Sequence, residues 1–124
     1  MTLRELYDRI DGDYIQATNV LRVDKLIDKH IRKLPQNGVV DRLIEAGRTM
    51  DATELFENAH AMKGVCGNLG LVKLAAAASE ISEEFRPGNP RCFTDAEVKE
   101  KIEGISELYE KTKTEIKNYE ASQK

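Results

Sequence analysis

One stretch decides the fold, namely residues 51–70, which read DATELFENAHAMKGVCGNLG. Its apolar residues follow one another at intervals of four, three, four and three positions: Leu55, Ala59, Met62, Cys66 and Leu69. This spacing places them on one side of an α-helix and predicts a seam that faces a helical core. Asp51 with Glu54 three positions later resembles a capping box, and Gly70 suits the end of the helix.

The sequence on both sides of this stretch is also helical in pattern. We expect helices at residues 3–10, 14–20, 23–34, 39–49, 71–85 and 95–119. Pro35 and then Asn37-Gly38 should interrupt or kink the chain, and residues 86–91, RPGNPR, should stop a helix. The predicted fold is all-α, an antiparallel four-helix bundle with a short extra N-terminal helix. It forms one domain over residues 1–124, with a helical cap at 1–22 and a frayed tail at 120–124.

The flanking helices also have apolar stripes that should be buried. The predicted inward residues are Val23, Leu26, Ile27, Ile31 and Leu34; then Leu74, Ala75, Ala78, Ile81 and Phe85; and then Val98, Ile102, Ile105, Leu108 or Tyr109, Thr112 and Ile116. His30 falls inside the first stripe, which predicts a core or boundary histidine without a functional role. Cys66 and Cys92 lack any metal-ligand spacing and are expected to be reduced thiols, with Cys66 in the core.

Composition and charge exclude several classes of partner. The net charge is −3 and no basic block occurs, so we expect no nucleic-acid partner. No apolar run approaches the roughly 18 residues that span a membrane, and the N-terminus has no apolar signal core. We therefore expect a cytoplasmic protein without a membrane partner. Four helices complete their own core, so a monomer is expected.

The side of the central helix opposite the seam carries the chemistry. At about 100° per residue, His60 points roughly 140° away from the core direction. Phe56, Gly64 and Gly67 fall on the same outer side, and Lys63 lies at its border. Gly64 leaves bare space beside the imidazole, and the Lys63 ammonium can offset the charge of phosphoryl oxygens. An imidazole that is largely neutral near physiological pH is a nucleophile.

The segment from His60 to Gly70 resembles the signature of histidine-containing phosphotransfer (HPt) domains. In that signature a histidine is followed by two residues, a lysine, a glycine, and then five residues to another glycine. The resemblance implies that His60 is the phosphoacceptor, Lys63 its supporting lysine and Gly64 its small neighbour. It extends loosely over residues 11–86. Two features differ from the signature, since Met62 stands where leucine is usual and Val65-Cys66 replace small residues. The changes at Met62 and Cys66 concern packing, because both lie on the core seam, and Val65 is expected to alter the surface near the site slightly.

The resemblance also implies a function and partners. The chain is expected to act as a phosphorelay intermediate that accepts a phosphoryl group from a receiver-domain aspartate and passes it to another receiver. Its partners would be response-regulator receiver domains, and a hybrid sensor histidine kinase is a further candidate. The chain would need no cofactor or metal of its own, because the receiver supplies Mg²⁺ and most catalytic groups. It would be a carrier without kinase activity, since no Walker loop or glycine-rich nucleotide box is present.

Two alternatives remain open at this point. The chain could be a helical protein-interaction module that is not phosphorylated. Phe56, which we group with Glu57 and Gly67 as the expected partner-binding residues, could equally cover the neighbouring helix. A metal site in the bundle is weakly supported, because Glu57 and His60 form only one of the two Glu-x-x-His pairs that such sites use.

Overall fold

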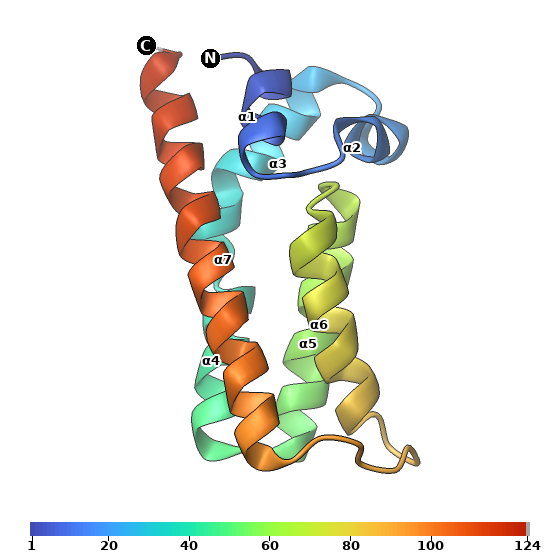
Figure 1. The fold of residues 1–124 in the computed structure, drawn as a ribbon. Helices are drawn as coiled ribbons and strands as arrows, with labels where there is room; N and C mark the ends of the chain where they lie inside the picture. Colours follow the sequence, from blue (N-terminus) through green and yellow to red (C-terminus); the bar gives the residue numbers. More distant parts are fainter. Residues whose placement is uncertain (124) are drawn as a thin grey trace.

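The computed structural model describes residues 1–123, and its regular structure is entirely helical (Figure 1). Within that range the helices are α1 (Leu3–Arg9), α2 (Tyr14–Leu21), α3 (Asp24–Asn37), α4 (Val39–Thr49), α5 (Ala52–Asn68), α6 (Val72–Phe85) and α7 (Asp95–Ser122). The prediction of an all-α fold is confirmed. The expected helices are all present, with ends that differ by up to three residues.

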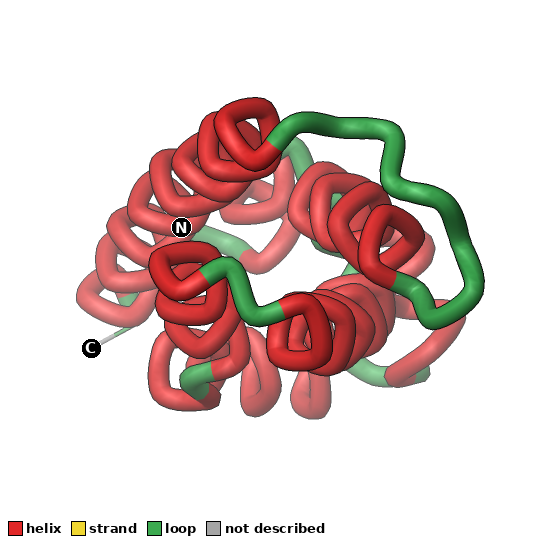
Figure 2. The backbone as a smooth tube through the Cα atoms, turned by 90° about the horizontal axis from the view of Figure 1, so that it is seen from below, coloured by secondary structure: helices red, strands yellow, loops and turns green. Residues whose placement is uncertain are grey.

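Helices α4 to α7 form the bundle. α5 packs against α4 on one side and α6 on the other, and α7 closes the ring by packing against α4 and α6. Figure 2 shows the bundle from below, with the helices arranged around a common core and the loop between α6 and α7 extending outward. α3 precedes α4 along the chain and carries the structure beyond the bundle, where it packs against α2 and α7.

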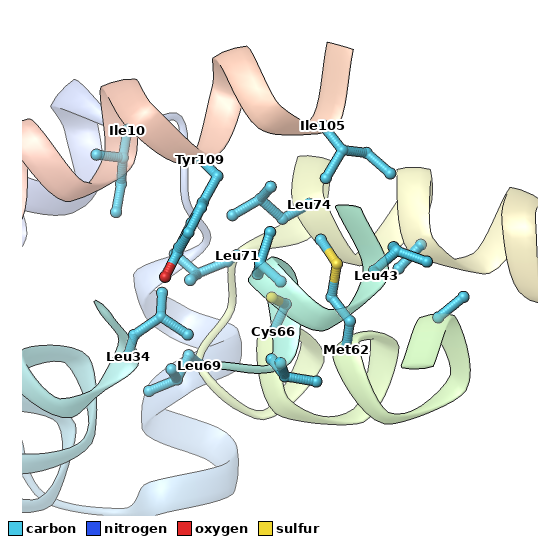
Figure 3. Close-up of a cluster of buried hydrophobic side chains, with 14 of the residues drawn as sticks. Ile10, Leu34, Leu43, Met62, Cys66, Leu69, Leu71, Leu74, Ile105 and Tyr109 are labelled. Atoms are coloured by element: carbon cyan, nitrogen blue, oxygen red, sulfur yellow. The ribbon is translucent and has the colours of Figure 1, made fainter. Parts of the chain in front are cut away.

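The core is apolar and contributed by every bundle helix (Figure 3). Leu43 of α4, Met62 and Cys66 of α5, and Ile105 and Tyr109 of α7 are each at most 1% exposed. Both cysteines are free thiols, and Cys92 is exposed. Burial raises the pKa of the Cys66 thiol to about 12, which leaves it protonated and unreactive. Within residues 1–123, no helix is long and apolar enough to cross a membrane.

The predicted stripe of α3 is only partly correct. Ile27, Ile31 and Leu34 are buried, but Val23 and Leu26 are 52% and 39% exposed. His30, predicted to lie in the core or at its boundary, is also exposed. One residue step turns about 100° around a helix, so Val23, Leu26 and His30 share a flank beside the buried row. No helix among residues 1–123 covers that flank, since all three side chains are exposed.

The structure also differs from the predicted helix limits and inward residues in a few smaller respects. α3 continues through Pro35 to Asn37, and the break comes at Gly38, whose φ of 80° lies in the left-handed region. In α7 the buried residue of the open pair is Tyr109, while Leu108 is only half-buried, as is Ala75 in α6. The tail predicted to fray at 120–124 is helical as far as Ser122, and Lys124 lies outside the described residues.

Helices α1 and α2 lie over the C-terminal end of α5 (Figure 1). Three hydrogen bonds join them to the last turn of α5 and the turn that follows. The Tyr7 hydroxyl donates to the Leu69 carbonyl at 2.6 Å, the Asp13 N–H to the Gly70 carbonyl at 2.7 Å, and Gln16 Nε2 to the Gly67 carbonyl at 2.7 Å. These bonds give partners to three backbone carbonyl groups, one in the last turn of α5 and two just after the helix.

Gly70 is the residue that allows this close approach. Its φ of 69° is strained for any other residue, and a Cβ there would lie 2.2 Å from the Asp13 carbonyl oxygen. Backbone cannot move aside as the end of a side chain can. A glycine is therefore required here for two separate reasons.

Replacing Gly70 by alanine should lower the free energy of unfolding by about 2 kcal/mol or more, because strain at positive φ adds to the collision with Asp13. Gly88→Ala is the matched control, since Gly88 has a φ of 94° but open space around its Cα. Denaturant unfolding of both variants separates the two contributions. Equal losses in the two variants would show that the contact with Asp13 does not matter.

Candidate functional site

The sequence of α5 fixes which residues face solvent. The helix begins where the Asp51 side chain accepts a hydrogen bond from the Glu54 N–H at 3.0 Å. The four seam residues inside the helix, Leu55, Ala59, Met62 and Cys66, are fully buried. His60 stands on the opposite side and is exposed. No hydrogen bond engages its imidazole among the residues that the structure describes, so both ring nitrogens are accessible to a reactant.

Phe56 lies against the His60 ring. Their ring centroids are 5.8 Å apart and the ring planes differ by 19°, which is a stacked arrangement. Residues four apart are neighbours on a helix surface, and side chains tilt towards the helix N-terminus, so His60 leans over the turn that holds Phe56. The Arg86 guanidinium lies over the Phe56 ring in turn, 5.4 Å from its centroid.

On the other side of His60 along α5, the position one turn later is Gly64, which has no side chain. A Cβ built at Gly64 or at Gly67 would meet nothing within 4 Å. Gly67 is half-buried, because α2 approaches it and Gln16 binds its carbonyl. The surface next to the imidazole is therefore bare backbone, with α2 at its far edge.

Lys63 supplies a positive charge on the side of α5 that faces α6. Its side chain is exposed, and no ion pair within residues 1–123 engages it. It lies close enough to Glu83 of α6 to act on that carboxyl. A hydrogen bond from Arg86 is the main cause that holds the pKa of Glu83 below its ordinary value, and Lys63 adds to the effect.

The chemistry of this arrangement is that of a single exposed nucleophile. An imidazole nitrogen can attack an electrophile brought by another molecule, and an ammonium group one turn away can attract anionic oxygens. Among residues 1–123, no group of three or more His, Cys, Asp or Glu side chains is arranged to hold a metal ion.

The structure brings most of the predicted residues together. Phe56, Glu57, His60, Lys63 and Gly64 lie on the outer half of α5, whereas Gly67 is partly covered by α2. His30 lies elsewhere, in a groove of about 320 Å³ between α2, α3 and α5. The sequence did not predict that Glu83 would lie near Lys63 or that Arg86 would lie over the Phe56 ring. No spacing could have found Arg86, because its sequence context indicates only the end of a helix.

Comparison with known families identifies the family of the chain. The model of the Hpt domain family matches residues 26–111, well over half of the chain. The chain therefore belongs to the histidine-containing phosphotransfer domains, which carry phosphoryl groups in phosphorelays and partner with receiver domains. Neither the curated proteins nor the solved structures give a significant match. The matched range excludes α1 and α2, the two helices that lie over the end of α5.

Proposed function

We propose that this chain accepts a phosphoryl group on His60 from the phosphoaspartate of a receiver domain and passes it to the aspartate of another receiver. The observation that carries this proposal is the exposed imidazole of His60 on the outer side of α5, with open space at Gly64 and, at Lys63, a cation without an ion-pair partner among the described residues. The chain belongs to the HPt family, and its segment from His60 to Gly70 resembles the signature of that family.

The transfer step uses only one nucleophile from this chain. The lone pair of an unprotonated imidazole nitrogen forms a bond to phosphorus while the bond from phosphorus to the aspartyl oxygen breaks. The electron pair of that bond leaves with the aspartate, which becomes a carboxylate, and the imidazole releases a proton to solvent from its other nitrogen. The second transfer is the reverse step with a different aspartate. Mg²⁺ belongs to the receiver, where it offsets charge on the phosphoryl group.

Lys63 and Gly64 assist this step in different ways. The ammonium of Lys63 can reach the phosphoryl oxygens, since it lies three residues after His60 on the same helix. Gly64 keeps the approach free, because any side chain at this exposed position would extend into the space beside the imidazole. Glycine inside a helix lowers helix stability by about 1 kcal/mol relative to alanine. At Gly64 this loss accompanies free access of a phosphoryl group to the imidazole.

The receiver should dock over α5 and the neighbouring surface of α2 and α3. Large apolar side chains are exposed there: Ile15, Val20, Val23 and Leu26, at 39–59%. This surface adjoins the predicted partner-binding residue Gly67, because Gln16 of α2 binds the Gly67 carbonyl directly. Large exposed apolar side chains on neighbouring helices are typical of a protein-protein interface.

The central test is transfer from a receiver. An isolated receiver domain from the same cell is phosphorylated with acetyl phosphate and Mg²⁺ and then mixed with this chain. We expect acid-labile phosphate on His60 by mass spectrometry at neutral pH, and none on the His60→Gln variant, whose circular dichroism should match the wild type. Labelling of His60→Gln to the wild-type level would contradict the assignment. Absence of transfer from every receiver would favour the interaction module.

The open space at Gly64 predicts a steric effect. Gly64→Gln should slow transfer from the receiver by about tenfold or more, because the new side chain occupies the space through which the phosphoryl group approaches the imidazole. The matched control is Gly104→Gln on α7, since Gly104 is also exposed and its Cα also has open space around it. The control should transfer at the wild-type rate. Equal rates for both variants would show that the space beside His60 is not needed.

The apolar surface predicts a loss of docking. Ile15→Asp should raise the KM for the phosphorylated receiver roughly tenfold, because it places a charge in an interface that must exclude water. Labelling by potassium phosphoramidate, a small donor that needs no docking surface, should be unchanged. Ala96→Asp, at an exposed position where α7 begins, is the control at the other end of the bundle. An unchanged KM for Ile15→Asp would move the docking surface away from α2.

A further inference from the structure

His60 is the last member of a row of contacts that begins at the end of α6. Glu83 holds the Arg86 guanidinium by two hydrogen bonds, at 2.7 and 3.2 Å, and Asn89 donates to the backbone carbonyl of Glu83 at 3.0 Å. Arg86 lies over the Phe56 ring, and Phe56 stacks on the imidazole. The exposed His60 side chain thus contacts the half-buried Phe56 ring, and Arg86 at the end of α6 contacts that ring in turn.

We propose that Phe56 is a positioning residue, which holds the His60 imidazole in the orientation that attacks phosphorus, and that Arg86 keeps the Phe56 ring in place. The inference rests on the proposed role of His60 as phosphoacceptor. It adds a function for the aromatic ring four residues earlier and for the end of α6.

The geometry suits this role because of where an imidazole reacts. The lone pair of each ring nitrogen lies in the plane of the ring, whereas stacking covers a face. Phe56 can therefore restrict rotation of the imidazole and leave both nitrogens open. An isolated exposed histidine samples several staggered rotamers, and only some of them present a nitrogen to a docked receiver. On the C-terminal side, Gly64 offers no contact that could hold the ring instead.

The surroundings of Phe56 distinguish positioning from the two simpler roles. A residue that only covers the neighbouring helix would not need to stack on His60, and the observed ring planes are nearly parallel. A residue that only contacts a partner would stand free, whereas Phe56 is half-buried and already contacts His60 and Arg86. Neither simpler role accounts for both contacts.

The test compares Phe56→Leu and Phe56→Tyr with a matched control, Phe93→Leu. Phe93 is also half-buried and also contacts a cation, the Lys101 Nζ at 4.5 Å, but it precedes α7 and does not touch His60. Each protein is labelled by potassium phosphoramidate and by the phosphorylated receiver. Proton spectra of the His60 ring are recorded alongside, and circular dichroism verifies the fold.

We expect Phe56→Leu to label roughly fivefold more slowly with both donors, with a lower kcat and an unchanged KM for the receiver. Phe56→Tyr should restore the rate, since it keeps the ring, and Phe93→Leu should match the wild type. The His60 ring protons should shift in Phe56→Leu as the neighbouring ring current is lost. If Phe56→Leu fails to fold, Arg86→Gln provides the test at the surface, with a smaller rate loss in the same direction.

Three results would overturn the inference or its basis, and they can be told apart. Wild-type rates in Phe56→Leu with both donors would show that stacking does not position the imidazole. A raised KM for the receiver with an unchanged phosphoramidate rate would make Phe56 a partner contact only. A wild-type protein that no donor labels at His60 would instead overturn the proposed function, whatever the spectra show for the stack.

Discussion

Burial of one side of α5 is the constraint on which the rest of the structure depends. Four residues on this side are fully buried in the core of the bundle: Leu55, Ala59, Met62 and Cys66. Their packing fixes the rotation of α5 about its own axis. A turn of even one residue position would bring His60 towards the core and Ala59 towards solvent. The display of the histidine is therefore a consequence of packing on the opposite side of the same helix.

Glycines serve opposite purposes in this chain. At Gly64 the absent side chain leaves the surface bare beside His60, and nothing lies within 4 Å of a Cβ built there. At Gly47 and Gly70 the absent side chain permits contact, because a Cβ would come within 2.7 Å of Ile102 Cδ1 and within 2.2 Å of the Asp13 carbonyl, respectively. The first kind reduces helix stability in exchange for access, and the second kind joins α4 to α7 and α5 to α2.

Charged side chains at the end of α6 hold the loop that follows this helix in place. The Glu84 carboxylate is buried and accepts hydrogen bonds from Arg91 and from the N–H groups of Cys92 and Phe93. Burial opposes its ionisation, but these bonds outweigh burial and hold the pKa of Glu84 below its ordinary value. The Glu84 carboxylate thus anchors the loop after α6, while Arg86, which is paired with Glu83, lies over the Phe56 ring. This anchorage loses strength only as the pH falls through the lowered pKa of Glu84.

The sequence by itself determined the helices, the seam of α5 and the outward direction of His60, Lys63 and Gly64, because a period of 3.6 residues fixes which side chains share a face. Capping residues such as Asp51 also set helix starts locally. The exposure of Val23, Leu26 and His30 could not be predicted, since their apolar or neutral character fits a core stripe and only the arrangement of α2 beside α3 left that flank uncovered. The contact of Arg86 with Phe56, across thirty positions of chain, likewise exists only because α5 and α6 pack antiparallel and bring a helix end beside the imidazole. Periodicity is a local property of the chain, whereas burial and long-range contacts depend on where other helices lie.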